Sequence, residues 1–359
     1  MLLRVQVSKM KEYNIIKKVL KYPISMTALK ACKTLDLSDR WIPKKLRARA
    51  TLNRQRLLDK ATNRVFTIID IPTYDGFNQT VHPDVIKQLD NNQKEYYLMA
   101  ITPYPYGYDK YENPCIYNSA DGVEWRPLRT EPLFFPSRGR GNHLSDPELV
   151  VSKEKIFLYF RECIFGEEKF DIIYRSESKN LIDWSEARNI ITMDSQEGLI
   201  SPTIIQVNDA FINFIISKTR GLLRNKDKSG KYENAFYECC IKGEPRDRII
   251  WHIDIKQIKE EYLAGLFVYA TELGGREAKL FYAESYDSGC NWDILGEIKL
   301  CDNQEEIIDS VYRATIVEDI KTDGYNLYVS LMTKEYSWHT VLIKQFSEHI
   351  LNVDYLRKD

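Results

Sequence analysis

A short motif recurs five times along this chain, each time ahead of a run of β-forming residues, and this repeat constrains the fold more than any other feature. The steps between successive copies are 64, 55, 51 and 61 residues, measured between Pro83, Pro147, Pro202, Ile253 and Ala314. No long amphipathic helical pattern separates the copies. The repeat therefore favours an all-β domain over a parallel α/β sheet.

A second element follows three of these copies: a strand that enters a polar turn and ends on tryptophan. It spans residues 117–125, 174–184 and 282–292. Repeats of roughly 50–60 residues with several short strands each are typical of β-propeller blades. The sequence therefore predicts an all-β fold, a five-bladed β-propeller with a short N-terminal helical segment, in which the tryptophans cover strand ends.

The N-terminal part differs in charge and in periodicity. Residues 1–60 contain 16 Lys or Arg and four acidic residues, a net charge of +12 that leaves −13 for the rest of the chain. Ile15, Ile16, Val19 and Leu20 recur at helical spacing. We expect a basic, mainly helical segment over residues 1–64 and the propeller over 65–359. The segment packs on the acidic propeller in one interpretation and docks on a protein or membrane surface in the other.

The composition argues against several classes of protein. A net charge of −1 argues against bulk attraction to nucleic acid. Lysines interrupt the apolar runs near the N-terminus, and no stretch approaches the roughly 18 apolar residues of a membrane span. We expect cytoplasmic synthesis without a signal peptide or transmembrane segment, and the final location stays open. The seven cysteines lack a C-x-x-C pair, which predicts reduced thiols that form no metal site.

Propeller topology predicts which polar residues meet. The innermost strand of a blade starts on one face, the second strand returns to that face, and the third strand starts there again. Polar residues at these strand ends should therefore lie near the axis. These residues are His82, Asp84, Tyr104, Glu112, His143, Asp146, Arg161, Glu162, Ser201, His252, Asp254, Tyr312 and Arg313.

Several of these residues belong to motifs with a familiar order and spacing. The motifs are His-Pro-Asp-Val at 82–85, Tyr-Glu-Asn-Pro at 111–114, Ser-Asp-Pro at 145–147, Trp-His-Ile-Asp at 251–254 and Tyr-Arg at 312–313. Together with the Ser-x-Asp-Gly-x-x-Trp turn at 119–125, they resemble the five-bladed glycoside hydrolases of family 43. Unclassified relatives of that family, some encoded near capsule genes or in phages, are similar too. The resemblance covers about residues 65–345.

The resemblance implies inverting hydrolysis of a glycosidic bond by two carboxyl groups. By position, Asp84 matches the general base of the family and Asp146 matches the second-blade Asp that tunes the acid. Ser201 stands where the general acid, a Glu on the third blade, would be expected. Glu112 and Glu162, at strand ends on the same face, are the candidates for the missing acid, and Glu197 is a third.

The remaining axial residues are expected to bind substrate. His82, His143 and His252 suit sugar hydroxyls or carboxylates better than a metal, and Ser201, Asp254 and Tyr312 join them. Arg161 and Arg313 pair with carboxylates or grip an acidic sugar. Tyr104 belongs to a tyrosine-rich loop that stacks on sugar or simply packs. No cofactor or metal ligand is predicted, and a structural Ca²⁺ in the channel stays open.

These observations predict a glycosidase that acts on a poly- or oligosaccharide. A non-catalytic glycan-binding propeller of a phage or surface assembly is one alternative. The presence of Ser201 where the family has a Glu favours this alternative. A glycan-transferring or phosphorolytic enzyme of capsule or glycan assembly is the other, with phosphate bound by Arg161, Lys218 and Arg224. Fold analogy alone does not choose among them.

Overall fold

The computed structural model describes residues 43–90, 92–137, 141–152, 155–165, 169–271, 277–347 and 351–352. The chain divides into two compact units, residues 1–52 and 53–359, and the propeller lies in the second. The helical pattern predicted around Ile15–Leu20 lies outside the described residues. Helix α3 (Pro43–Lys60) begins at a proline, which suits a first helical turn, and continues through good helix formers. Among the described residues, no helix is both long and apolar enough to cross a membrane.

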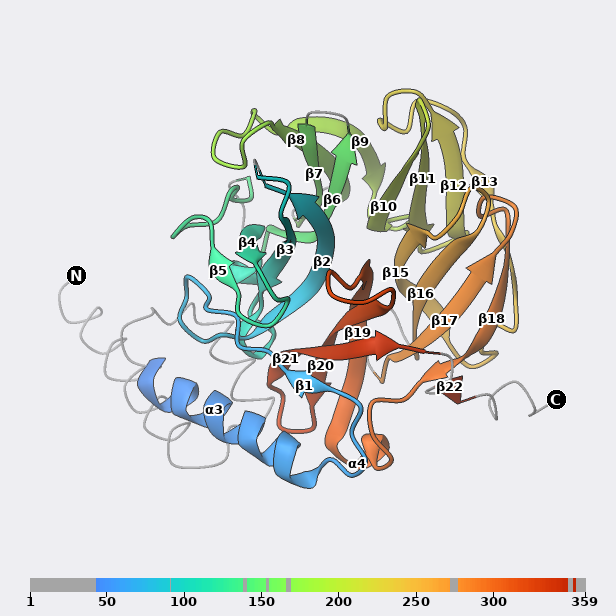
Figure 1. Cartoon of the computed structure of the whole chain (residues 1–359). Coiled ribbons are helices and arrows are strands. Elements are labelled where there is room, and N and C mark those ends of the chain that lie inside the picture. Colours follow the sequence, from blue (N-terminus) through green and yellow to red (C-terminus); the bar gives the residue numbers. More distant parts are fainter. Residues whose placement is uncertain are drawn as a thin grey trace, which may run out of the picture. The chain divides into compact units, whose positions relative to one another are not determined.

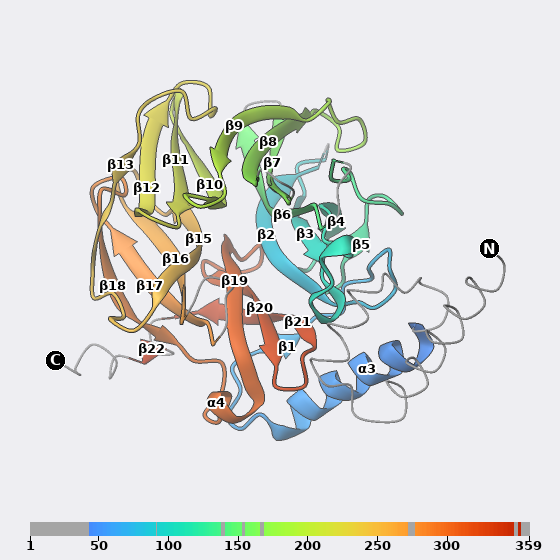
Figure 2. The same cartoon turned by 180° about the vertical axis from the view of Figure 1, so that it is seen from behind.

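Five sheets surround one axis and form the predicted five blades, as Figures 1 and 2 show from opposite sides. Blade one contains β2 (Thr80–Leu89), β3 (Glu95–Pro103), β4 (Cys115–Ser119) and β5 (Arg126–Pro127). Blade two contains β6 (His143–Ser152), β7 (Lys155–Ile164), β8 (Phe170–Ser178) and β9 (Arg188–Asp194). Blade three contains β10 (Leu199–Val207), β11 (Ala210–Ser217), β12 (Gly221–Asp227) and β13 (Tyr237–Glu238).

Blade four has two additional short strands. It contains β15 (Ile249–Gln257), β16 (Leu263–Ala270), β17 (Lys279–Ser285) and β18 (Asn291–Ile298). The additional strands, β14 (Cys240–Lys242) and β22 (Leu351–Asn352), both pair with β18. Short helical turns η1 (Pro105–Gly107), η2 (Asp109–Tyr111) and α4 (Gln304–Ile307) occupy connections between strands.

The ring closes through a strand from the start of the propeller. Blade five contains β19 (Ile308–Glu318), β20 (Tyr325–Thr333), β21 (Trp338–Phe346) and β1 (Thr67–Ile68). Thr67 pairs with Leu342 in antiparallel register, so the last blade takes its outermost strand from residues that precede the first blade. Closure of this kind covers an edge that would otherwise be open to other strands.

The predicted tryptophan turns recur with the same hydrogen bond in three blades. The indole Nε1 groups of Trp125, Trp184 and Trp292 donate to the carbonyl oxygen three residues earlier in each turn, at 3.2, 3.1 and 3.1 Å. Trp292, which is 1% exposed, packs edge-on against Phe214 of the neighbouring blade. The packing role predicted for these tryptophans is therefore confirmed.

A bulge at the start of the innermost strands decides which residues occupy equivalent positions. Regular pairing breaks after Val81, Ser145 and Ile200. Two residues are then unpaired, and pairing resumes at Asp84, Glu148 and Thr203. His82, Asp146 and Ser201 thus occupy the same bulge position, each with a left-handed backbone. His82 therefore matches Asp146 and Asp84 matches Glu148, so the predicted base Asp84 and the predicted second-blade residue Asp146 do not hold equivalent positions in their blades. A proline follows the bulge residue in all three blades, where no ladder N–H is needed.

Candidate active site and metal centre

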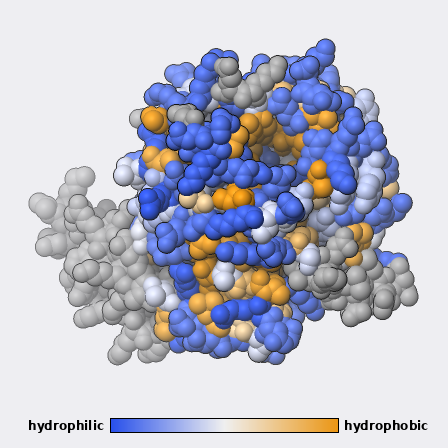
Figure 3. Space-filling model, in the orientation of Figure 1, coloured by the Kyte–Doolittle hydropathy of each residue, from blue (hydrophilic) through white to orange (hydrophobic). Residues whose placement is uncertain are grey.

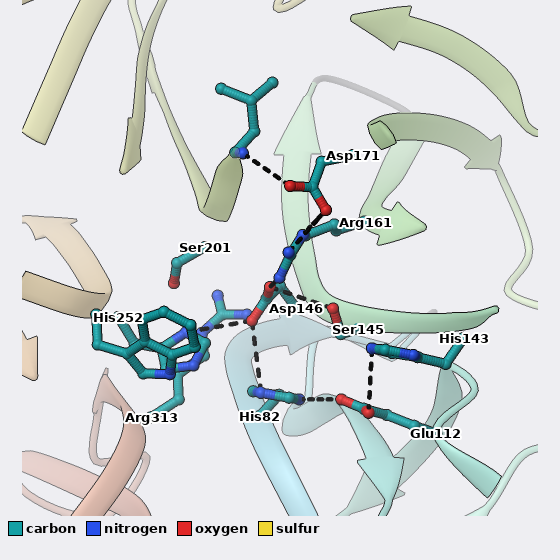
Figure 4. A network of polar contacts seen from close by, with 12 residues as sticks. His82, Glu112, His143, Ser145, Asp146, Arg161, Asp171, Ser201, His252 and Arg313 are labelled. Carbon is teal, nitrogen blue, oxygen red and sulfur yellow. Dashed lines mark hydrogen bonds and ion pairs between the residues drawn. The ribbon is translucent and has the colours of Figure 1, made fainter. Parts of the chain in front are cut away.

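Three side chains from three blades converge at the axis: His82 of β2, Asp146 of β6 and His252 of β15 (Figure 4). His82 Nε2 lies 3.5 Å from Asp146 Oδ1, and His252 Nδ1 lies 3.2 Å from the same oxygen. The three residues are 4%, 0% and 2% exposed. Irregular pairing near the starts of the three strands brings them together: His82 and Asp146 lie in bulges, and His252 is the first residue to pair again after the break at Trp251.

This cluster has the donor set of a divalent-cation site. Within the described part of the chain, Asp146 Oδ1 and both ring nitrogens of His252 are buried without a hydrogen-bond partner. One ligand atom from each residue lies within 4.8 Å of the other two. Two ligands about 2.1 Å from a tetrahedrally coordinated ion would be about 3.4 Å apart, close to the 3.2 and 3.5 Å found between these atoms. Two imidazoles and a carboxylate suit Zn²⁺, Mn²⁺ or Fe²⁺.

A carboxylate behind His82 fixes its tautomer. His82 Nδ1 lies 3.2 Å from Glu112 Oε1 and 3.1 Å from Thr102 Oγ1. Thr102 donates its own hydroxyl hydrogen to the carbonyl of Val81, so it can only accept from the ring. Nδ1 therefore carries the hydrogen, and Nε2 presents its lone pair to Asp146. Metal-ligating histidines commonly have such a carboxylate partner.

Glu112 also contacts a second histidine nearer to solvent. Its Oε2 atom lies 3.7 Å from His143 Nε2, and the His143 side chain is 15% exposed. His143 Nδ1 contacts the Gly141 carbonyl at 3.0 Å, and its ring stacks on Phe165. Burial opposes charge on this imidazole, but Glu112, Cys163 and the Gly141 carbonyl together outweigh burial and raise the pKa of His143 to about 10. His143 is therefore a cation at neutral pH.

Arg161 holds the Asp146 carboxylate from the other side. Its Nε and Nη2 atoms both donate to Asp171 Oδ1, at 2.9 and 2.7 Å, while Nη1 lies 3.5 Å from Asp146 Oδ2. Burial by itself opposes charge on Asp146, yet His252, His82 and Arg161 together hold the pKa of this carboxyl well below its usual range. Burial lowers the pKa of His252 to about 4, against the opposing effect of Asp146.

A second polar layer sets two cations, Lys256 and Arg313, against the carboxyl groups of Asp84, Glu148 and Asp254. Asp84 Oδ1 pairs with Lys256 Nζ at 3.1 Å, and its Oδ2 accepts from the Leu149 amide at 2.5 Å. Lys256 also lies 3.5 Å from Asp254 Oδ1. Arg313 donates to Glu148 at 2.7 Å. Asp84 and Arg313 are both 0% exposed, so neither is open to a sugar, and the geometry does not favour Asp84 as a general base.

The other predicted site residues bond or pack around the cluster. The Ser201 hydroxyl is bound between blades three and four, donating to the Ile253 carbonyl at 2.9 Å and accepting from its amide at 3.1 Å. Half-buried Tyr312 packs on His252 and accepts from the Trp251 indole at 2.9 Å. Half-buried Tyr104 packs on Trp338. The molecule is hollowed at the centre of the ring, with apolar side chains on part of the wall (Figure 3).

Glu162 points away from the cluster. Its Oε1 atom accepts from the Ser137 amide at 2.5 Å, whereas Arg161, one residue earlier on β7, faces Asp146. Successive strand side chains point to opposite faces, so the two residues cannot both serve the axis. The structure therefore separates Glu162 from the other predicted carboxylates.

The sequence contained a signal for the second layer that the motif comparison missed. A polar residue is followed two positions later by an acid in three blades, as His82 by Asp84, Asp146 by Glu148, and His252 by Asp254. Each pair supplies one residue to each axial layer. Asp171 and Lys256, which neutralise charges in the two layers, carried no comparable signal, because their partners come from other strands.

The comparisons with known proteins concern the fold. No family model matches this sequence, and no curated protein matches it either. A solved N-acetylgalactosamine deacetylase from F. plautii, in complex with blood group B trisaccharide, is similar with a TM-score of 0.65 and 17% identity, over 81% of this chain and 98% of that one. The GH43_1 enzyme from Xanthomonas citri, complexed with xylose, gives 0.56 and 11% identity over 81% and 92%. This chain has the five-bladed propeller fold of glycoside hydrolase family 43.

The sequence resemblance to the family 43 propellers is thus confirmed for the fold. A xylan β-1,4-xylosidase from Bacillus halodurans is similar as well, with a TM-score of 0.55 and 13% identity over 79% of this chain. The chain spans about half of that enzyme, 54% of its length. At these identities the likeness to family 43 propellers is a likeness of fold, and the chemistry depends on the axial residues.

Proposed function

We propose that this protein is a divalent-cation-dependent hydrolase that removes an acyl group, such as acetyl, from a saccharide. The observation that carries the proposal is the cluster of His82, Asp146 and His252, in which Asp146 Oδ1 and both ring nitrogens of His252 are buried without a hydrogen-bond partner among the described residues. The sequence predicted no metal ligand among the axial residues and left only a structural Ca²⁺ in the channel open. The orphaned donor atoms favour a cation instead, because a buried lone pair without a partner is costly.

Each residue of the site has a role in this reaction. His82 Nε2, Asp146 Oδ1 and a ring nitrogen of His252 would hold the cation, and Glu112 would keep the His82 ring in the ligating tautomer. The bound cation would supply Lewis-acid polarisation of an acyl carbonyl and a water of lowered pKa. His143, cationic and nearer to solvent, would give the proton from Nε2 to the leaving nitrogen or oxygen.

Two further observations support a saccharide substrate. One solved structure with a similar fold is a sugar deacetylase, and this chain covers 98% of it. Half-buried Tyr312 packs on His82, and half-buried Tyr104 packs on Trp338, which contacts Tyr312. Flat aromatic faces of this kind stack on sugar rings.

Hydrolysis of a glycosidic bond is the second candidate, and Glu112 favours it. Glu112 and Asp146 are buried carboxyl groups on opposite sides of His82, and two separated carboxyl groups are what glycoside hydrolysis requires. The bulge position of the third blade, however, holds Ser201 with its hydroxyl fully engaged between blades. Acyl hydrolysis at a cation needs no carboxyl group there.

The test separates the two reactions on the same protein. Protein stripped with EDTA and reloaded with Zn²⁺, Mn²⁺ or Fe²⁺ is incubated with N- and O-acetylated oligosaccharides, and acetate and new reducing ends are measured separately. We expect metal-dependent acetate release. In the His252→Ala variant, acetate release should fall by more than roughly 10–100-fold, the usual cost of losing a residue that only hydrogen-bonds a metal ligand.

A matched control is His339→Ala, because His339 is a buried histidine, 5% exposed, that bonds Ser337 outside the cluster. This variant should bind metal and release acetate like the unaltered protein. Release of reducing ends without acetate would favour the glycosidase. A protein that binds no metal by calorimetry would contradict the proposal.

A further inference from the structure

A second cavity, of about 380 Å³, opens between blades three and four. It lies close to the candidate site along the chain, since Ile250 lines it and His252 follows two residues later on β15. Its polar lining is dominated by cations: Lys218, Arg246 and Arg248, with Glu244 as the one carboxylate among its described lining residues. The chain after residue 60 carries a net charge of −13, so this group of cations is opposite in sign to the net charge of the rest of the propeller.

Two of these cations are held in place and are largely buried. The Arg248 side chain is 10% exposed, and that of Lys218 is 16% exposed. Lys218 lies directly over Gly198, where an added Cβ would come within 2.6 Å of its Cδ. Its ammonium group donates to the Ser195 carbonyl at 3.0 Å. The position of Lys218 is thus built by the fold, in contrast to that of a freely moving surface lysine.

The carboxylates near these cations are shared or already engaged. Asp171 Oδ2 lies 3.5 Å from Lys218 Nζ, but Oδ1 of the same carboxylate accepts two hydrogen bonds from Arg161. Among the described residues, Arg248 has one ion pair, at 3.9 Å, with the exposed Asp247, and its Nη1 donates to the Glu277 carbonyl. Glu244 accepts a hydrogen bond from the Tyr269 hydroxyl at 3.0 Å. Three cations around a cavity with one carboxylate in its described lining favour an anionic ligand.

We infer that this cavity is a subsite for an anionic sugar residue, so that the substrate is an acidic saccharide bearing carboxylate, sulfate or phosphate groups. The inference rests on the proposed function and names the class of its substrate. A chain of contacts from Lys218 through Asp171 and Arg161 to Asp146 joins the cavity to the axial cluster. A saccharide with one residue in the cavity and another at the axis would contact both ends of this chain. Guanidinium groups bind carboxylates and phosphates with paired hydrogen bonds, which suits Arg246 and Arg248.

The test measures binding and does not depend on turnover. Calorimetry or NMR titration compares a hexuronate oligosaccharide, a sulfated one, a phosphorylated one and a neutral one of equal length, with metal-loaded and metal-free protein. We expect an acidic oligosaccharide to bind at least about tenfold more tightly than the neutral one, the scale of one hydrogen bond to a charged group. The preference among the three acidic ligands identifies the group.

Substitutions locate the subsite. Arg248→Gln and Arg246→Gln should remove most of the preference for the acidic ligand and leave neutral binding unchanged, and Arg248→Lys should retain part of it. Arg246 is exposed, so its substitution tests the subsite even if Arg248→Gln fails to fold. The control is Lys242→Gln, because the Lys242 side chain is 73% exposed and lies on β14.

Equal binding of acidic and neutral oligosaccharides would overturn the inference, as would an acidic preference that survives both substitutions of Arg246 and Arg248. Either result leaves the proposed function intact if metal-dependent acetate release persists. Conversely, an acidic preference in a protein that binds no metal would support the subsite and reject the proposed chemistry. The two proposals can therefore fail separately.

Discussion

Glu112 shows how much of the axial chemistry depends on one hydrogen atom. This carboxylate lies between His82 and His143, at 3.2 and 3.7 Å, and is 4% exposed. By accepting from His82 Nδ1, it leaves Nε2 unprotonated and aimed at Asp146. By facing His143, it keeps that ring charged. A single buried carboxylate thus sets the protonation of two histidines with opposite requirements.

Glu112→Gln should weaken divalent-cation binding by roughly 10–100-fold, the usual cost of losing a carboxylate behind a ligating histidine. The amide can still hydrogen-bond, but it no longer favours one tautomer of His82 or the charged form of His143. The measurement is a calorimetric titration with Zn²⁺ or Mn²⁺. Glu162→Gln is the matched control, since Glu162 is 3% exposed and points away from the cluster. Equal loss in both variants would contradict the role given to Glu112.

At the scale of the strand, the bulges explain what sequence could and could not predict. Five blades followed from the repeat, because strand length, turn residues and the closing tryptophan are local properties. The axial location of His82, Asp146 and His252 followed from topology. Their roles did not, since a two-residue bulge decides whether His82 or Asp84 matches Asp146. Pairings such as Arg161 with Asp171 join separate strands and leave no trace in local sequence.

The tryptophan turns offer a test at the same scale. Gly289 has φ +86, and an added Cβ would lie 2.4 Å from Phe214 of the next blade, whereas Gly221 has φ +76 and open space around it. Gly221→Ala should cost about 1–2 kcal/mol of backbone strain. Gly289→Ala should cost a further ~1–3 kcal/mol through overpacking between blades. Urea unfolding measures both, and equal losses would mean that the turn does not press against Phe214.

For the molecule as a whole, the short strand β1 determines whether the ring is closed. A variant that begins at Asn53 keeps Leu57, Phe66 and β1, and it should unfold cooperatively. A variant that begins at Asp70 loses all three. It should lose about 3–6 kcal/mol of unfolding free energy, since Leu57 and Phe66 are each 3% exposed in the core. Denaturant unfolding compares the two. Equal stability would show that closure through β1 adds nothing.

The late position of the closing blade also orders events during synthesis. A ribosome releases β1 before any blade exists, yet its partner β21 emerges only after residue 338. Glu148 likewise has no Arg313 to balance it until β19 emerges, because Arg313 belongs to the last blade. Incomplete chains therefore expose an open sheet edge and unpaired axial charge at the same time, a combination that invites capture by chaperones or proteases. Because the axial charges balance only when the last blade is present, the ring becomes stable only once the chain is complete.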